Sequence, residues 1–325
     1  MDVIRKSPHY LLLLGLLLLL VPALAQGFDN INDTRKVVIG FSQATTNEPW
    51  RLLFNKELRA EATKYPQLEL LVRDGMDTVE KQIADVQAFI DRPVDAILIS
   101  PKVAEELTPV VSRAFNAGIP VFVLDRDLVN DRYTQFIGGD NLEIGRAAGR
   151  YAVNLLGGPG LARGRIAEIW GGMASTPAQD RHKGFYEVIS QEPGIALVGS
   201  PGDGDWKQDL GYEIMLETLQ NHEQIDLVYA HNDPMAYGAH MAAKDMGRER
   251  DIAFLGIDGI PAEGVQWVYD GILTATFLYK TPGDEGIRQA MAFLRGQEVE
   301  KRLILPTMTI DRSNAEDILR SHGLL

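Results

Sequence analysis

Short apolar segments alternate with amphipathic helical segments from residue 37 to about 278, and this alternation limits the possible folds more than any other feature. The apolar segments read as strands at 37–41, 68–72, 96–100, 120–124, 165–170, 227–230, 252–257 and 273–278. Helical patterns lie between them, for example at 78–90 and 104–118, and Gly118 is typical of a helix end. Strand, helix and strand repeated in this order predict an α/β fold with parallel sheets and right-handed crossovers.

Two stretches of the chain repeat one another loosely. The stretches that begin at Val94 and Ile225 both contain an acidic residue, a buried strand, a polar strand end, a helix, a glycine and a second buried strand. Asp125 follows the first stretch and Asp258 follows the second. Internal duplication gives this pattern, and so do two unrelated strand–helix–strand units. A duplication would produce two similar lobes, each with polar groups at the ends of its strands.

The first 25 residues have the composition of a secretory signal peptide. Arg5 and Lys6 precede a leucine-rich apolar run, and the small residues Ala23 and Ala25 follow it. We expect cleavage after Ala25. An uncleaved membrane anchor is the alternative, but the run is short for a helix that spans a bilayer.

Composition narrows the compartment and the partners. The 325 residues include no cysteine, which excludes disulfides and a lipid-modified amino-terminal cysteine. We therefore expect a soluble periplasmic protein, with extracellular release as the alternative. The formal net charge of −13 argues against nucleic-acid binding through a broad cationic face.

Charged side chains follow the buried segment 120–124 directly. Asp125 and Arg126 stand at the carboxyl end of this strand, which is where open α/β sheets bind their ligands. A solvated loop, or an ion pair closing a helix, would also explain such charges. Asp258 occupies a similar strand end in the second half, and Gly259 after it permits a tight turn.

The first strand ends in a polar loop that leads into Trp50. Pro49 suits the first turn of a helix that begins here. Trp50 could stack on the apolar face of a sugar ring, and Glu48 and Arg51 offer hydrogen bonds. Packing of Trp50 under the lobe, with Arg51 solvated, is the alternative.

Further polar residues occupy the second half. Arg181 lies early in a helix predicted to continue to Ile189, where it either reaches a cleft or lies on the surface, and His182 reads as an ordinary surface histidine. Asn232 offers donors and an acceptor at a strand end. Two aspartates read as helix caps, namely Asp205 and Asp233, and Trp206 either packs or lines a cleft.

Enzyme signatures are absent from the sequence. It contains no GxSxG, no HExxH, no P-loop and no cysteine nucleophile. The glycine-rich stretch 157–164 is not a dinucleotide-binding loop, because it precedes a strand and such a loop follows one. The acidic stretch 202–211 lacks the ligand spacing of a calcium loop. Local motifs therefore identify no catalytic group, no metal site and no cofactor site.

Taken together, the strand ends resemble those of periplasmic sugar-binding proteins of the ribose- and galactose-binding type, the solute receptors of ABC importers. The motifs that carry the resemblance are IGFSQATTNEPWR, VDAILISP, IPVFVLDRD, DRHKGF, HNDPMAYGA and GIDG, spread over roughly residues 36–310. GFSQ…WR and YAHND look especially similar to the galactofuranose-binding branch.

This resemblance implies two Rossmann-like lobes with parallel sheets, a hinge of three crossovers, and one monosaccharide bound in the cleft between the lobes. The N-terminal lobe would comprise residues 36–139 and 280–308, and the C-terminal lobe residues 140–279 and 309–325. Gly138 and Gly139 suit a hinge that must absorb backbone rotation, although a glycine pair is equally ordinary in a turn.

The resemblance also implies ligand contacts from both lobes. The residues concerned are Glu48, Trp50, Arg51, Asp125, Arg126, Arg181, Asn232, Asp258 and Tyr279. Asp125 and Arg126 would bind the hydroxyls and the ring oxygen. Glu48 and Arg51 stand where ribose receptors tend to have Asn and an aromatic residue, which argues against ribose. Tyr279 lies near the position of a ligand-binding amide, with an apparent one-residue difference in length.

The function implied is capture of a monosaccharide, a hexose or related sugar, and its delivery to the permease of an ABC transporter. A periplasmic receptor that signals to a membrane histidine kinase or a chemoreceptor is the alternative with the same fold. A secreted carbohydrate-active enzyme is the alternative of a different class. We expect a monomer that has no catalytic residues and binds no nucleic acid.

Overall fold

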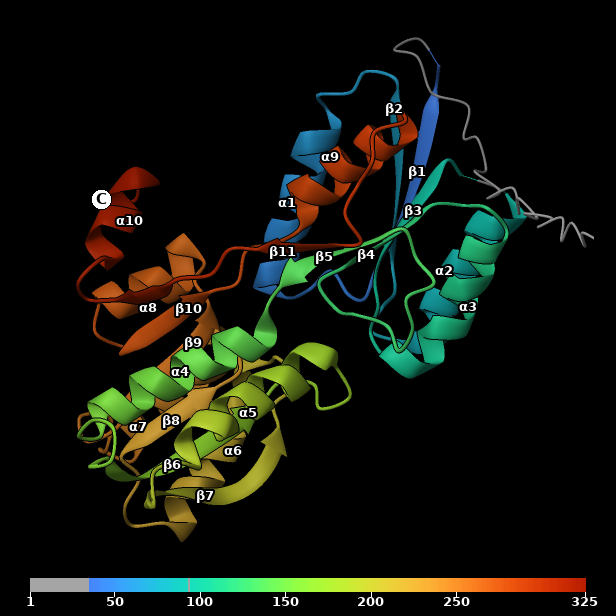
Figure 1. The fold of residues 1–325 in the computed structure, drawn as a ribbon. Helices are drawn as coiled ribbons and strands as arrows, with labels where there is room; N and C mark the ends of the chain where they lie inside the picture. The colour runs from blue at the N-terminus through green and yellow to red at the C-terminus, as the bar shows by residue number, and fades with distance from the viewer. Residues whose placement is uncertain (1–34, 93) are drawn as a thin grey trace, which may run out of the picture.

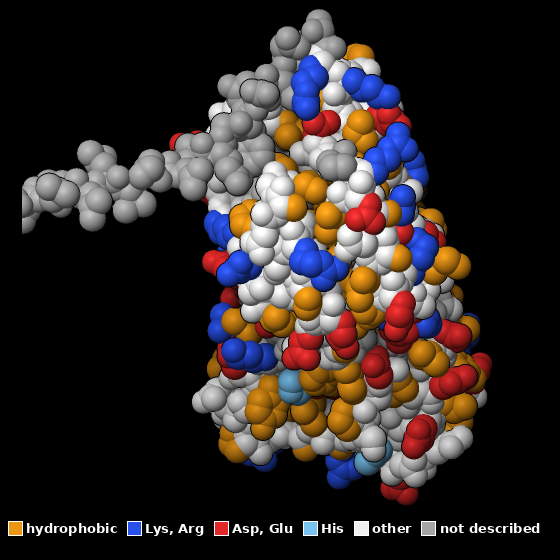
Figure 2. Space-filling view, turned by 90° about the vertical axis from the view of Figure 1, so that its right-hand side faces the viewer, with side chains coloured by type: hydrophobic (Ala, Val, Ile, Leu, Met, Phe, Trp, Pro, Cys, Tyr) orange, Lys and Arg blue, Asp and Glu red, His pale blue; other side chains and the backbone are white. Residues whose placement is uncertain are grey.

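The computed structural model describes residues 35–92 and 94–325, which form two lobes, each built around one sheet (Figure 1). The predicted signal peptide, residues 1–25, lies outside the described residues. Within the described ranges, no helix combines the length and the apolar character that crossing a bilayer requires. Lys and Arg are interspersed with Asp and Glu on the face shown in Figure 2, so this face has no continuous basic surface.

The first lobe is built on a six-stranded sheet in which all the pairings are parallel. Its strands are β1 (Val37–Gln43), β2 (Leu68–Asp74), β3 (Ala96–Ser100), β4 (Val121–Leu124), β5 (Gln135–Gly139) and β11 (Arg302–Leu305), in the spatial order β11-β5-β4-β3-β1-β2. β3, β4 and β5 are buried along their whole length, as expected for strands covered by helices on both faces.

The second lobe is built on another six-stranded sheet with a similar order. Its strands are β6 (Arg163–Trp170), β7 (Gly194–Asp203), β8 (Leu227–Ala230), β9 (Ala253–Asp258), β10 (Ala275–Leu278) and β12 (Thr309–Asp311), in the order β12-β10-β9-β8-β6-β7. Only the edge pairing of β10 with β12 is antiparallel among these strands. The predicted α/β fold with two parallel-dominated sheets is confirmed.

Helices cover both faces of each sheet. In the first lobe, α1 (Pro49–Ala62) and α9 (Gly283–Leu294) lie on one side, and α2 (Val79–Asp91) and α3 (Ala104–Asn116) lie on the other (Figure 1). In the second lobe, α4 (Asn141–Leu155) packs on α5 (Thr176–Ile189), and α6 (Gln208–Asn221) packs on α7 (Asp233–Asp245). The other helices are the π-helix η1 (Pro261–Val265), α8 (Gln266–Tyr269) and α10 (Ala315–Ser321).

The α4–α5 contact depends on glycine. A Cβ on Gly145 would lie 2.3 Å from the Arg181 carbonyl oxygen, and a Cβ on Gly184 would lie 2.1 Å from the Leu142 carbonyl oxygen. The two backbones approach so closely that no side chain fits between them at these points. This contact fixes α5, which carries Arg181, against the first helix of the second lobe.

The chain passes between the two sheets three times, after β5, after β10 and after β11. The predicted lobe boundaries stay a prediction, and the membership of the strands in the two sheets is compatible with them. Gly138 and Gly139 form the end of β5, so reading them as a turn is wrong. A Cβ on Gly139 would lie 2.6 Å from the ring of Tyr279, and this close approach explains why glycine occupies position 139.

Two of the predicted helix caps are wrong. The residue before α6 is Lys207, and the Asp205 carboxylate instead pairs with the Lys207 ammonium at 2.5 Å. The cap of α7 is Asn232, whose side-chain oxygen accepts a hydrogen bond from the Met235 backbone N–H at 3.0 Å. The predicted helix end at Gly118 is confirmed, since this glycine follows α3 with φ of 84°.

Candidate functional site

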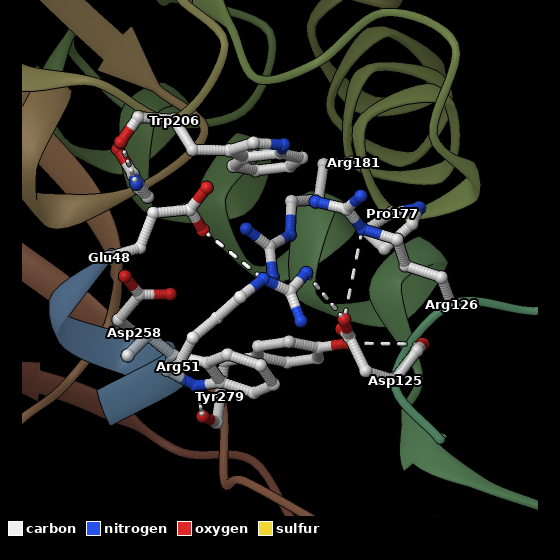
Figure 3. Close-up of a pocket in the computed structure, with 11 residues that line it drawn as sticks. Glu48, Arg51, Asp125, Arg126, Pro177, Arg181, Trp206, Asp258 and Tyr279 are labelled. Atoms are coloured by element: carbon white, nitrogen blue, oxygen red, sulfur yellow. Dashed lines mark hydrogen bonds and ion pairs between the residues drawn. The ribbon is translucent and has the colours of Figure 1, made fainter. Parts of the chain in front are cut away.

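A pocket of about 320 Å³ lies where the carboxyl ends of the strands of the two lobes face one another. Its lining consists of Glu48, Trp50, Arg51, Asp125, Arg126, Pro177, Arg181, Trp206, Asn232, Asp258 and Tyr279 (Figure 3). All nine residues named from the sequence therefore line one pocket, together with Pro177 and Trp206.

Asp125 is held at the end of β4 in a backbone conformation that few residues adopt. Its φ is 68°, in the left-handed region, where Asp is among the tolerated non-glycine residues. One carboxylate oxygen accepts a hydrogen bond from the Tyr279 hydroxyl at 2.7 Å. The other accepts from Arg51 and from Ser100, both at 3.1 Å. The strand end thus turns a buried carboxylate, 4% exposed, toward donors from three separate elements.

Arg51 crosses the pocket from the first turn of α1. Its guanidinium donates to Gln43 at 2.7 Å and to Ser100 at 3.0 Å, in addition to Asp125. Glu48 lies one turn back with a carboxylate oxygen 3.3 Å from Arg51 Nε, although this buried N–H has no hydrogen-bond partner among the described residues. The sequence alternative of a solvated Arg51 is wrong, because the side chain is 2% exposed.

The charges in the first lobe stabilise one another. Burial raises the pKa of Asp125, but the guanidinium groups of Arg51 and Arg126 outweigh it and hold that pKa below its usual value. Burial, followed by repulsion from Arg51, lowers the pKa of Arg126, but arginine side chains stay protonated in proteins. The pocket therefore presents one carboxylate and two guanidinium groups in charged form.

Arg181 enters the pocket from α5 of the second lobe. Its Nε donates to Asn141 at 2.9 Å, and another of its nitrogens donates to the His231 carbonyl oxygen. The guanidinium lies between two aromatic rings, 4.5 Å from the centre of Tyr279 and 5.4 Å from that of Trp206. Figure 3 shows these two rings on opposite sides of the pocket with guanidinium groups between them.

Tyr279 joins the two halves of the site. Its hydroxyl donates to Asp125 and accepts from the Asn141 amide at 3.3 Å, and its backbone N–H donates to the Asp258 carbonyl oxygen at 3.0 Å. Burial, followed by the neighbouring Asp125 charge, raises the pKa of this phenol well above its usual value. Trp50 stacks on the ring at 5.2 Å and donates its indole N–H to the Tyr279 carbonyl oxygen. Trp50 thus both lines the pocket and packs inside the lobe.

Asp258 differs from Asp125 in having no internal partner. Its φ is 139°, it is 6% exposed, and no described residue donates a hydrogen bond to its carboxyl group. Burial, followed by repulsion from Asp233, raises its pKa well above the usual value. Burial also raises the pKa of Asp233 to about 7. The carboxyl group of Asp258 is therefore available for a ligand and holds its proton more readily than an ordinary aspartate.

The remaining sequence assignments have different outcomes. Asn232 lines the pocket, but its amide already caps α7 and donates to the Trp206 carbonyl oxygen at 3.0 Å. His182 is not an ordinary surface histidine, because its Nδ1 lies 2.9 Å from a carboxylate oxygen of Glu168 and its ring packs 4.3 Å from Trp170. Both histidine and glutamate lie outside the pocket lining.

Sequence reasoning left several contributors out of the candidate set. Trp206 forms one wall of the pocket, and the sequence signal for it was an aromatic residue directly after the polar stretch 202–205. Gln43 and Ser100, the last residues of β1 and β3, orient Arg51 from behind. Polar residues at the ends of buried strands are the pattern that identified Asp125, and the same criterion would have found both.

This arrangement suits a small ligand rich in hydroxyl groups. Three guanidinium groups can donate, three carboxyl groups can accept, and three aromatic side chains offer apolar contact within one pocket. No group of three or more His, Asp or Glu side chains in residues 35–92 and 94–325 is placed to hold a metal ion.

Comparison with known proteins identifies a family and several relatives that are named for binding sugars. The profile of the periplasmic binding protein domain family matches residues 39–298. The galactofuranose-binding protein of Escherichia coli (strain K12) is 34% identical over 252 residues, which is 75% of this chain and 78% of that protein.

Two solved structures are similar over most of the chain. The fructose-binding periplasmic domain of a hybrid two-component system is 39% identical with a TM-score of 0.84, covering 88% of this chain and 94% of that domain. A Mycobacterium smegmatis protein in complex with β-D-fucofuranose is 30% identical with a TM-score of 0.82, covering 89% of this chain and 96% of that chain.

Proposed function

The chain belongs to the periplasmic binding protein domain family, and from this premise we propose that it captures a monosaccharide between its two lobes and delivers it to the permease of an ABC importer. The observation that carries the proposal is the convergence of charged and aromatic side chains from both lobes on one pocket of about 320 Å³. Hydroxyl groups both donate and accept, so guanidinium and carboxyl groups placed side by side match a sugar.

Each lobe has a distinct part in holding the sugar. The first lobe supplies a preorganised, charged surface, because a hydrogen bond joins Arg51 to Asp125 and Ser100 binds both of them. The second lobe supplies Asp258, whose carboxyl group no described residue satisfies, and the face of Trp206. A buried carboxyl group without a partner gains most from a ligand hydroxyl.

A sugar in the five-membered ring form is the ligand we favour. The relatives named above bind galactofuranose and fucofuranose, and the third binds fructose, which also forms a five-membered ring. Glu48 and Arg51 replace the Asn and aromatic residue expected for ribose, so a ligand other than ribose is proposed. Glu48, held beside Arg51, would select among the hydroxyls that reach this side of the pocket.

Binding is coupled to closure of the lobes. The Asp127 backbone N–H donates to the Thr176 hydroxyl across the cleft at 3.1 Å, and Arg126 lies 5.7 Å from the centre of the Trp206 ring. A ligand that touches both lobes adds to these contacts and so favours the closed form. The closed form is then the species that the permease recognises.

The protein works as an exported monomer in this proposal, after cleavage of its signal peptide behind Ala25. A sensory role is the second candidate, because the fructose-binding domain that is 39% identical belongs to a hybrid two-component system. In that role the closed form would contact a membrane receptor in place of a permease. Sugar uptake by cells that lack the gene, compared with sugar-induced transcription in the same cells, separates the two roles.

Thermal unfolding of the chain from Gln26 onward against pentoses, hexoses and inositols tests the binding proposal. A sugar at about a hundred times its dissociation constant adds roughly 2.7 kcal/mol, which raises the unfolding temperature by a few degrees. We expect one or a few sugars to do so, and we expect Asp258→Ala to abolish the shift. Asp251→Ala, on the exposed surface of the same lobe, is the matched control. A flat response from folded protein would contradict the proposal.

A further inference from the structure

A second hollow, larger than the sugar pocket, lies beside it at the rim of the cleft. Its open space, part of which is continuous with solvent, is about 770 Å³, and the two hollows share Glu48 and Trp206 as a common boundary. Other residues that line it are Asn47 from the first lobe and Gln208, Glu263 and Trp267 from the second. Asn47 and Gln208 are exposed, so this hollow communicates with solvent.

The lining of the second hollow has the chemistry of a carbohydrate subsite. Two tryptophans, Trp206 and Trp267, line it, and indole rings stack on the apolar faces of sugars. Trp267 is held in place by the ring of Tyr237 at 4.5 Å. Glu263 lines the same hollow, and one of its carboxylate oxygens is buried with no hydrogen-bond partner among the described residues. A ligand hydroxyl would satisfy this oxygen.

A third hollow, on the other flank of Trp206, lacks these features. Its lining includes Lys102, Asp203 and Asp205, and Trp206 is its single aromatic residue. Its charges are already used, because Lys102 pairs with Asp77 and Asp205 pairs with Lys207. The two flanks of the sugar pocket are therefore not equivalent, and only the side that contains Trp267 offers a second aromatic surface.

We infer that the cleft accepts a short glycoside, with one sugar ring in the pocket and a second ring or polyol in the hollow between Trp206 and Trp267. The linkage would pass between Glu48 and Trp206, which border both spaces. Because both lobes contribute to the second hollow, its occupant would also favour closure. This inference rests on the proposed function of the first pocket as a sugar site.

Calorimetric titration with matched pairs of probes tests the inference. Each sugar of the panel is compared with a glycoside that contains it, for example fructose with sucrose and galactose with melibiose. We expect at least one glycoside to bind as tightly as its free sugar or roughly three- to tenfold more tightly, as a stacked second ring predicts.

Two variants place the second ring. Trp267→Ala removes the aromatic surface. Gln208→Trp fills the hollow from an exposed position, so it tests the inference even if Trp267→Ala does not fold. Both should weaken glycoside binding about tenfold or more and leave free-sugar binding unchanged. Free sugars that bind while every glycoside fails would overturn the inference and leave the proposed function standing. Glycoside binding that neither variant alters would also overturn it. Absence of any carbohydrate binding would overturn both proposals.

Discussion

Replacing Arg51 by methionine should strongly destabilise the ligand-free protein. Arg51 is 2% exposed and lies 3.1 Å from the Asp125 carboxylate, which is 4% exposed. Removing one partner of a buried ion pair costs about 3–5 kcal/mol, because the other charge stays buried without compensation. Arg126 remains 3.8 Å from the same carboxylate, and Tyr279 and Ser100 still donate to it. We therefore expect a loss near the lower limit, about 3 kcal/mol.

The loss should depend on pH in a defined direction. In the wild type the pKa of Asp125 lies below its usual value, so its charge stabilises the fold above the unfolded pKa of about 4, and this contribution is lost as the pH falls through the folded pKa. Without Arg51, burial raises the pKa of Asp125, and the carboxyl group is neutralised at higher pH. The difference between wild type and variant should therefore shrink from pH 7 toward pH 4.

Urea unfolding at several pH values measures both effects, and a second substitution separates the charge from the packing. Adding Asp125→Asn to Arg51→Met removes the uncompensated charge while keeping a residue that tolerates φ of 68°, so the double variant should be more stable than Arg51→Met alone. Arg150→Met, which breaks an exposed pair with Glu143, is the control and should change little. A loss under about 1 kcal/mol for Arg51→Met, or no recovery in the double variant, would refute the reasoning.

Three further predictions concern the second lobe. Asn232→Ala removes the cap of α7 and should lower stability by about 1 kcal/mol in urea unfolding, and an unchanged midpoint would contradict the cap. Gly184→Ala places a methyl group 2.1 Å from the Leu142 carbonyl oxygen and should lower stability by about 1–3 kcal/mol, whereas an unchanged melting temperature would mean that α4 and α5 separate freely. The folded pKa of Asp233, about 7, lies above its unfolded value, so the wild type loses stability as the pH rises from 4 through 7. Asp233→Asn has no titratable group at this position and so does not lose stability in this way. Its free energy of unfolding in urea should therefore rise relative to that of the wild type between pH 5 and pH 8. A difference in free energy that stays constant over this range would exclude the raised pKa.

The parts of the site that the sequence predicts are those fixed by the geometry of parallel sheets. Parallel strands place their carboxyl ends at one edge, so polar residues at the ends of buried strands, such as Asp125 and Asp258, are brought to the same cleft. Arg51 follows for a similar reason, because Pro49 begins a helix at the end of β1 and sets Arg51 in its first turn.

The parts that the sequence does not predict depend on contacts between distant segments. β7 was not predicted, because it is an exposed edge strand that contains several glycines and a proline and so lacks a continuous apolar run. Which of Asn232 and Asp233 caps α7 also depends on a residue that is distant in the sequence. The Asp233 carboxylate instead accepts a hydrogen bond from the Gly259 backbone N–H at 2.9 Å, a partner 26 residues away.

The position of β11 determines when the first sheet can be completed. β11, residues Arg302–Leu305, pairs with β5, residues Gln135–Gly139, and the whole second-lobe sheet except β12 lies between them in the chain. During synthesis, the β5 edge of the first sheet therefore stays unpaired until almost the entire polypeptide has emerged. Pairings of such long sequence separation form slowly, because loop closure must precede the contacts that stabilise it. Completion of the first lobe is thus a late event, which must wait for the strands of the second lobe to be synthesised.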